Sequence, residues 1–413
     1  MQKATAYQGF AKARLIVILA FMSSLAPLST DMYLPALGEV QRSFTTTPFY
    51  AQLSLAIFFI AFAFGQLIYG PLSDAYGRKK PLYIGIALFI VASFACISFD
   101  SVDSFIFWRF LQALGGCAGV VIARAIINDN FALKEAASAF ALMMVVSSLA
   151  PMLAPVFGGF LLDFFSWKSI FATLFALGIL LFVLIIFGIQ EKESVQRVKP
   201  EFKVVLVNYF HILQDRRFRI YILFSSLVMA TIFAYITGSS FIFREYFGLS
   251  EKTYGILFGV NALSFMIFAN INARIVRKYS PYAVLPYAFM MMFGVALVLL
   301  VVGWFDLGFL PFEILLFLML GMNGFIVPNT TTLAMARFKQ MSGSASAILG
   351  MVQFIFAGVI SFVVGAVEAN TPFPLALIIA CCLLLACGIY FSLNVREIRR
   401  YKREFLSLFK HSS

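Results

Sequence analysis

Long apolar runs, separated by short polar intervals, repeat along the whole chain. Each holds about 18 or more residues, enough for a helix rising about 1.5 Å per residue to cross a hydrocarbon layer of about 30 Å. Transmembrane β-strands would be about ten residues long with alternating polarity, so the pattern predicts helices. The twelve expected spans are 14–35, 50–70, 81–99, 104–126, 138–162, 168–189, 219–242, 253–274, 282–303, 311–333, 344–367 and 374–394.

The longest polar interval, residues 190 to 217, divides these spans into two sets of six. We therefore expect an N-terminal bundle over 1–190, a cytoplasmic linker over 191–217, a C-terminal bundle over 218–394 and a basic tail over 395–413. A weak internal echo supports a duplication, because "GPLSDAYGRKKP" (70–81) follows the second span and "NINARIVRKYSP" (270–281) follows the eighth. The predicted fold is all-α and integral to the membrane, with twelve helices in two pseudo-symmetric six-helix bundles.

The composition agrees with a membrane protein, since 62% of the 413 residues are hydrophobic and only 12% are charged. The net charge of +12 raises the possibility of a nucleic-acid partner, so the position of the basic residues decides. If Met1 is cytoplasmic, 25 of the 31 Lys and Arg residues fall in cytoplasmic segments, as the positive-inside rule requires. No nucleic acid is needed to explain the charge, and both termini are expected in the cytoplasm.

Other segments limit the function classes. Lys3, Lys12 and Arg14 precede the first apolar run, but the lack of a small-residue cleavage site favours an uncleaved first helix over a signal peptide. The five cysteines lie in apolar spans without metal-ligand spacing. The absence of a G-x-x-x-x-G-K-[ST] loop and the presence of only two histidines argue against ATP-driven pumping and a histidine metal centre. No cofactor is expected, and a secondary transporter, a channel or a non-transporting scaffold remains.

Asp31 lies about four residues inside the far end of the first span, between Pro27 and Pro35. A charged side chain at a helix centre costs about 2.5–3.5 kcal/mol on insertion, which makes a functional role the first hypothesis. The two prolines also free backbone carbonyls, and such polar backbone is tolerated only beside protein or water. We expect Asp31 to face the bundle interior; the alternative is a helix end wetted by lipid headgroups.

Arg109 in the fourth span follows Asp103 by six residues, which places it about 9 Å into the membrane. Asp31 approaches a comparable depth from the other direction, so the two side chains are expected to share one cavity. Burial favours the neutral carboxyl and a nearby guanidinium favours the ionised one. Asp31 is therefore predicted to exchange a proton, with Arg109 as its partner in proton coupling.

Two spans carry small or helix-bending residues. Small residues allow close helix packing, and paired prolines with a diglycine bend a helix, although ordinary tight packing explains both patterns equally well. In the fourth span, Gln112 and the small residues Ala113, Gly116, Gly119 and Ala123 lie at helical spacing from Arg109. In the fifth span, which contains "LAPMLAPVFGGF", the small and helix-bending residues are Pro151, Pro155, Gly158 and Gly159.

Polar side chains inside the spans are candidates for a substrate cavity, although each satisfies a neighbouring helix equally well. These candidates are Tyr33, Gln52, Gln112, Tyr235, Asn261 and Gln353. Arg124 and Asp129, at the end of the fourth span, are expected to be interfacial anchors rather than site residues.

The segment "GPLSDAYGRKKP" closely resembles the cytoplasmic signature loop of the major facilitator superfamily, with Gly70, Asp74, Gly77 and Arg78 in matching places. Ala75 stands where that family usually has a basic residue. The resemblance implies that this loop holds the two halves together on the cytoplasmic side. It also implies a part in the switch between inward-open and outward-open states.

Three further segments extend the resemblance over essentially the whole chain. "RFLQALGGCAGVVIARAIIND" looks like the family's second motif, whose leading arginine, here Arg109, is implicated in proton coupling. "LAPMLAPVFGG" is similar to the fifth-helix motif of drug exporters, with Pro155, Gly158 and Gly159 at its core. "LAPLSTDMYLPAL" and "YITGSSFIFREYFGLS" resemble the bicyclomycin-resistance (Bcr/CflA) subfamily of drug:proton antiporters, in which the acidic residue matching Asp31 takes part in proton and substrate binding.

The resemblance implies a transporter, not an enzyme, that exports small drugs in exchange for protons as a monomer in the bacterial inner membrane. Bicyclomycin and chloramphenicol-like antibiotics are candidate substrates. One alternative is a proton-coupled symporter that imports a nutrient or siderophore, since the fold does not fix the function. Another is a channel or scaffold, for which Asp31 would be dispensable.

Overall fold

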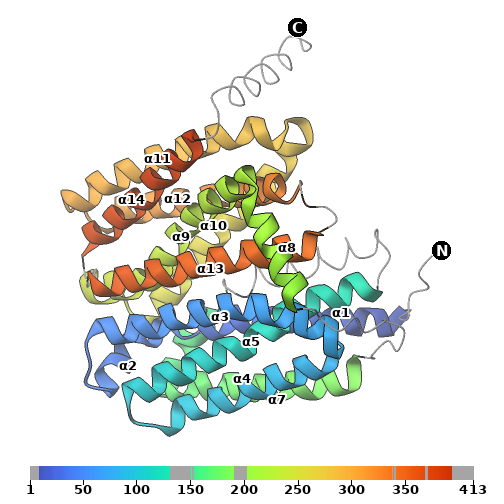
Figure 1. Ribbon diagram of the computed structural model, residues 1–413. Coiled ribbons are helices and arrows are strands. Elements are labelled where there is room, and N and C mark those ends of the chain that lie inside the picture. Colours follow the sequence, from blue (N-terminus) through green and yellow to red (C-terminus); the bar gives the residue numbers. More distant parts are fainter. Residues whose placement is uncertain are drawn as a thin grey trace. The chain divides into compact units, whose positions relative to one another are not determined.

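A computed structural model describes residues 9–130, 150, 153–189, 202–336, 338, 341–367 and 371–392. Every regular element in these residues is helical (Figure 1). The chain forms two compact units, one of Met1–Val205 with Ser250–Gly259 and one of Leu206–Leu249 with Val260–Ser413.

The first unit is built around helix α5 (Val102–Asn130), which packs against three neighbours. These are α1 (Gly9–Asp31), α3 (Pro48–Tyr76) and α4 (Lys79–Ser98). The helix α7 (Lys168–Gly188) contacts α4 and α1. A short 3₁₀ turn, η1 (Leu34–Ala36), and α2 (Leu37–Ser43) join α1 to α3, and an apolar helix spans Leu153–Phe164.

The second unit is built around α9 (Arg216–Phe241), which contacts α12 (Phe309–Met335), α13 (Ser342–Ala366) and α14 (Pro372–Phe391). Helix α11 (Pro281–Trp304) packs against α12 and α14. The π-helical turn η2 (Ile242–Tyr246) extends α9, and α10 (Glu251–Lys278) begins in the first unit and ends in the second. Helix α8 (Phe202–Gln214) precedes α9.

Local sequence explains where several helices begin and end. Pro48, Pro281 and Pro372 occupy the first positions of α3, α11 and α14, where a missing backbone donor costs nothing. Asp215 caps α9, because its carboxylate accepts a hydrogen bond of 2.8 Å from the Phe218 amide. Gly77 ends α3 with φ of +85°, a conformation that side chains with a Cβ rarely adopt.

The all-helical membrane fold predicted from the apolar runs is confirmed. Eleven helices in the described part of the chain are long and apolar enough to cross a membrane. The predicted fifth span, 138–162, falls mostly outside the described residues, and its described end forms the helix Leu153–Phe164.

Two predicted boundaries differ from the structure. The regular α-helix of the first span ends at Asp31, because Pro35 lacks the backbone N–H that would bond to the Asp31 carbonyl. The candidate membrane span continues through η1 and α2 to Ser43, beyond the predicted end at residue 35. The predicted linker also contains α8, whose apolar side chains were not recognised as helical within a polar interval.

Two glycines of α5 bring this helix into close contact with the backbones of its neighbours. A Cβ added to Gly115 would lie 2.6 Å from the Gly85 carbonyl oxygen and from the Phe89 nitrogen, and one added to Gly119 would lie 2.7 Å from the Met22 carbonyl oxygen. A Cβ at Gly116 would lie 3.4 Å from the Phe89 ring, which is ordinary contact. The close approach expected at Gly116 and Gly119 therefore occurs at Gly115 and Gly119.

Replacing Gly115 with Ala should destabilise the first unit, because the new methyl group meets the backbone of α4 rather than a movable side chain. We expect a loss of about 1–3 kcal/mol in the free energy of unfolding, measured as thermal stability of the detergent-solubilised protein. Gly294→Ala is the matched control, since a Cβ there meets no atom within 4 Å. Equal melting temperatures for the two variants would contradict this packing.

Candidate functional site

Asp31 is the last residue of α1 and is only 4% exposed. Its Oδ1 accepts a hydrogen bond of 3.0 Å from the Thr30 hydroxyl, which also reaches the Pro27 carbonyl at 3.0 Å. Beyond Asp31 the backbone turns into η1, so the acid stands where the regular helix stops. The structure thus buries a carboxyl inside the first unit at a break between two helical segments.

The glycine-rich fifth-span motif lies directly beside this break. A Cβ added to Gly158 would lie 2.2 Å from the carbonyl oxygen of Met32, the residue after Asp31. Gly159 approaches the Glu251 carbonyl in the same manner, at 3.0 Å from an added Cβ. Pro155 is buried in the same helix, whereas Pro151 lies outside the described residues. Gly158 therefore allows the helix Leu153–Phe164 to pack against the backbone next to Asp31.

Arg109 is fully buried in α5 and is fixed by hydrogen bonds from one of its terminal nitrogens. Nη1 donates to the Ser29 carbonyl of α1 at 3.1 Å and to the Gln112 side-chain oxygen at 2.6 Å. Gln112 in turn donates to the Ser93 hydroxyl of α4 at 2.7 Å. This chain of polar contacts joins α1, α5 and α4 in the interior of the first unit.

Three aromatic rings surround the guanidinium. Its central carbon lies 4.5 Å from the centre of the Phe58 ring, 5.0 Å from that of Tyr33 and 5.6 Å from that of Phe171. Cation–π attraction of this kind is strongest where water is excluded. The Tyr33 hydroxyl lies 3.1 Å from the Ser54 hydroxyl, which keeps the ring in place.

The Arg109 guanidinium contacts α1 close to Asp31 without a described bond to the Asp31 carboxyl. Arg109 bonds to Ser29, two residues before Asp31, and no ion pair or hydrogen bond between the two side chains occurs among the described residues. The guanidinium is held by the Ser29 carbonyl, the Gln112 side chain and three aromatic rings, and not by the Asp31 carboxyl.

Unused hydrogen-bonding capacity remains near this cluster. Nε and Nη2 of Arg109, and both polar atoms of the Gln52 side chain, are buried without a hydrogen-bond partner in the described part of the chain. Gln52 is fully buried on α3, two residues before Ser54. Buried groups without partners cost about 1–3 kcal/mol each, so they are positions where a ligand or a rearranged side chain is favoured.

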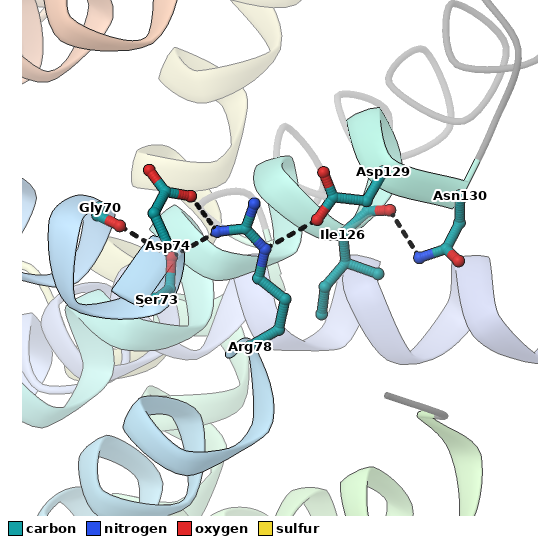
Figure 2. Close-up of polar contacts among 7 residues, drawn as sticks. All are labelled: Gly70, Ser73, Asp74, Arg78, Ile126, Asp129 and Asn130. Carbon is teal, nitrogen blue, oxygen red and sulfur yellow. Dashed lines mark hydrogen bonds and ion pairs between the residues drawn. The ribbon is translucent and has the colours of Figure 1, made fainter. Parts of the chain in front are cut away.

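A second polar cluster surrounds Arg78 in the turn between α3 and α4 (Figure 2). Arg78 Nε donates to Asp129 of α5 at 2.7 Å, and Nη1 donates to the Ser73 hydroxyl at 2.8 Å and to the Asp74 carboxylate. Ser73 itself donates to the Gly70 carbonyl at 2.9 Å. Figure 2 shows the guanidinium lying between the two carboxylates, so Arg78 ties the end of α3 to the end of α5.

Arg78 remains charged in this position. Partial burial lowers the pKa of the guanidinium, but the hydrogen bonds and charges of Asp129 and Asp74 outweigh it, so the pKa lies above its ordinary value. Gly77 supplies the positive φ that the turn requires, whereas a Cβ at Gly70 would meet nothing within 4 Å. Of the two glycines in this segment, only Gly77 occupies a position whose backbone conformation favours glycine.

The remaining cavity candidates lie in the second unit and form separate pairs. Asn261 Nδ2 donates to the Tyr235 hydroxyl at 3.0 Å, which brings α10 and α9 together. Gln353 of α13 donates to the Ser225 hydroxyl at 3.2 Å. Tyr235 and Asn261 thus form a pair. Gln353 of α13 contacts a different position on α9, at Ser225.

Two acids were missed or misjudged from the sequence. Asp129 was expected to be an interfacial anchor, but it is a direct partner of Arg78. Glu313 was not singled out, yet it is 7% exposed within α12. The rule that identified Asp31 would have found Glu313, because "FLPFEILLFLML" places a carboxylate inside an apolar run.

Comparison with known proteins agrees with this architecture. A model of the Major Facilitator Superfamily matches residues 19–362. The "Uncharacterized MFS-type transporter YdgK" of Bacillus subtilis (strain 168) is 32% identical, over 94% of this chain and 98% of its own length. The "Bicyclomycin resistance protein homolog" of Haemophilus influenzae is 28% identical, over 93% and 97%.

Among solved structures, a D-xylose-proton symporter superposes with a TM-score of 0.74 at 13% identity, covering 92% of this chain and 97% of the symporter. At this identity the likeness establishes the fold alone. The family model and the long relatives cover the segments that contain Asp31, Arg78 and Arg109. The chain therefore belongs to the Major Facilitator Superfamily and is a multi-pass membrane transporter.

Proposed function

We propose that this protein exports small neutral or cationic drugs in exchange for protons, by alternating access, with Asp31 as the proton-carrying group. The observation that carries the proposal is the buried carboxyl at the broken end of α1, whose hydrogen-bond partner is Thr30. The name of the bicyclomycin-resistance relative supports a drug as the exported molecule. The protein would act as a monomer in the bacterial cytoplasmic membrane, with both termini in the cytoplasm.

Burial makes the charge state of Asp31 depend on its surroundings. An ionised carboxylate is costly away from water, and a single hydroxyl donor does not compensate for that cost. The neutral form is therefore favoured while the acid is enclosed, and the ionised form is favoured when a conformational change exposes it to water or to a cationic drug. Inward proton movement supplies about 2.3 kcal/mol per charge for each 100 mV of membrane potential.

Arg109 is proposed to stabilise the ionised state of Asp31 during the cycle. Its Nη1 already contacts α1 at Ser29, and its Nε and Nη2 are donors without partners among the described residues. A charge-assisted hydrogen bond from such a donor would be stronger than a neutral one. The three rings hold the guanidinium in place while the proton is on the acid.

The cluster of Gly70, Asp74, Gly77, Arg78 and Asp129 is proposed to control the switch between states. Its ion pairs join the turn after α3 to the end of α5. A conformational change that separates these helix ends would break the pairs, so the cluster would stabilise one state over the other. The glycines Gly158 and Gly159 are proposed to let the fifth-span helix shift against its neighbours, which close backbone contact permits.

The rival is a proton-coupled symporter, since the same fold serves uptake in the xylose transporter. Exporter and symporter predict opposite directions of substrate movement. In inside-out vesicles an acidic interior drives protons out, so an antiporter accumulates drug in exchange and a symporter does not, whereas a proton gradient directed into the vesicles reverses the two results. Measuring uptake under both gradient directions separates the two mechanisms.

Replacing Asp31 with Asn should abolish proton-driven transport without unfolding the protein, because the amide keeps the shape and can still accept the Thr30 hydrogen bond. We expect transport of chloramphenicol in proteoliposomes to fall to the level of empty vesicles. Cells expressing the variant should be as sensitive to antibiotics as cells without the protein. Asp163→Asn, an exposed acid in the same unit, is the matched control. Unchanged transport by Asp31→Asn would remove this acid from the mechanism.

Replacing Arg78 with Ala should slow transport about ten-fold, which corresponds to about 1.4 kcal/mol in the barrier between states. The change removes the contacts to Asp129, Asp74 and Ser73 together. Lys80→Ala changes an exposed neighbouring charge and should have little effect. The measurement is the initial rate of drug transport at a fixed proton gradient.

The double variant Arg78→Asp with Asp129→Arg reverses the pair and should recover part of the rate that either single change loses. If the double variant is as slow as the sum of the two single changes predicts, the pair does not act as a unit.

A further inference from the structure

The second unit also encloses a carboxylic acid. Glu313 lies four residues after the first residue of α12, about 6 Å along the helix, and is 7% exposed. Both of its carboxyl oxygens are buried without a hydrogen-bond partner in the described part of the chain. An ionised carboxylate with no donor at membrane depth is among the most costly groups a helix can carry.

The side chain beside this carboxyl is Asn261 of α10. Its Nδ2 donates to the Tyr235 hydroxyl of α9 at 3.0 Å, which leaves its Oδ1 as a third buried oxygen without a partner among the described residues. The two Glu313 oxygens and Asn261 Oδ1 are therefore three buried acceptors without a described donor. A proton on the Glu313 carboxyl would supply the missing donor, because the acid could then donate a hydrogen bond to Asn261 Oδ1.

Within the described part of the chain, no basic side chain forms an ion pair or hydrogen bond with Glu313. Helices α11, α13 and α14 carry no Asp, Glu, Lys, Arg or His over their described lengths. Helix α10 carries charged residues only near its two ends. Arg244 and Glu245 lie in η2, and Asp306 before α12 accepts a hydrogen bond from Tyr246. None of these forms a described ion pair or hydrogen bond with Glu313.

Helices α10 and α12 pack closely further along α12. A Cβ added to Gly321 of α12 would lie 2.6 Å from the Ser264 hydroxyl, and one added to Gly324 would lie 2.6 Å from the Phe265 carbonyl oxygen. Ser264 also donates to the Phe317 carbonyl, so α10 and α12 are in direct contact. Calcium would need about six to eight oxygen ligands, and the described residues contain no group of three metal-ligating side chains.

We propose that Glu313 is a second proton-binding site, in which the protonated carboxyl donates its hydrogen bond to Asn261 Oδ1. The ionised carboxylate takes up one proton to become the neutral acid and returns it to water when the site opens. Glu313 would then carry a proton in addition to the one on Asp31. Its part in coupling rests on the proposed antiport, but its ability to bind a proton does not.

The test is an infrared titration of the purified full-length protein in lipid nanodiscs, without any drug. A protonated carboxyl has a carbonyl-stretch band that its ionised form lacks. We expect the carbonyl-stretch band of wild type at low pH to exceed that of Glu313→Gln by the intensity of one carboxyl, and this difference to disappear at high pH. Proton uptake over the same pH step, followed with an indicator dye, should fall by about one proton per molecule.

Asp306→Asn and Asp31→Asn are controls that should keep the Glu313 band. Asn261→Leu should keep the band but shift its frequency, because the acceptor of the hydrogen bond is gone, and this variant avoids changing the acid itself. Size-exclusion profiles check the fold of each variant. An identical band in wild type and Glu313→Gln, or a Glu313 band that persists at every pH, would overturn the proposal. A titrating band in a protein that transports no drug would instead refute the antiport and leave the site standing.

Discussion

The attachment of Arg109 to the backbone of α1 organises the polar interior of the first unit. One terminal nitrogen holds the Ser29 carbonyl and Gln112, and Gln112 continues to Ser93 of α4. In a membrane no water is available to satisfy such groups, so a buried guanidinium must find its partners within the protein. Because those partners come from α1, α5 and α4, the charge determines which helix faces can meet.

The same attachment places the broken end of α1 beside a permanent positive charge. Asp31 follows Ser29 by two residues, yet its described hydrogen bond comes from Thr30 and not from Arg109. The arginine is held by backbone, amide and aromatic rings, and the acid is held by one hydroxyl. Asp31 is therefore held by far fewer contacts than Arg109.

Each of the two units contains a buried carboxylic acid with few hydrogen-bond donors around it. Asp31 ends a helix next to Gly158, and Glu313 lies in the second turn of α12 beside Asn261. Each has fewer donors than a carboxylate requires, so in each the neutral form fits the surroundings better. Arg78 shows the opposite case. It lies at a less buried position between two carboxylates, which favour its charged form.

The apolar runs by themselves determined the all-helical membrane fold and most helix positions, because crossing a hydrocarbon layer requires a length and composition that few other structures share. They also marked Asp31 and Arg109, since a charge inside such a run is exceptional. The Asp129–Arg78 pair, the close approach at Gly115 and the Glu313–Asn261 contact were decided only by the tertiary structure. Each joins residues from different helices, and the rotation of one helix against another depends on side-chain packing that the spacing of residues along a single helix does not specify.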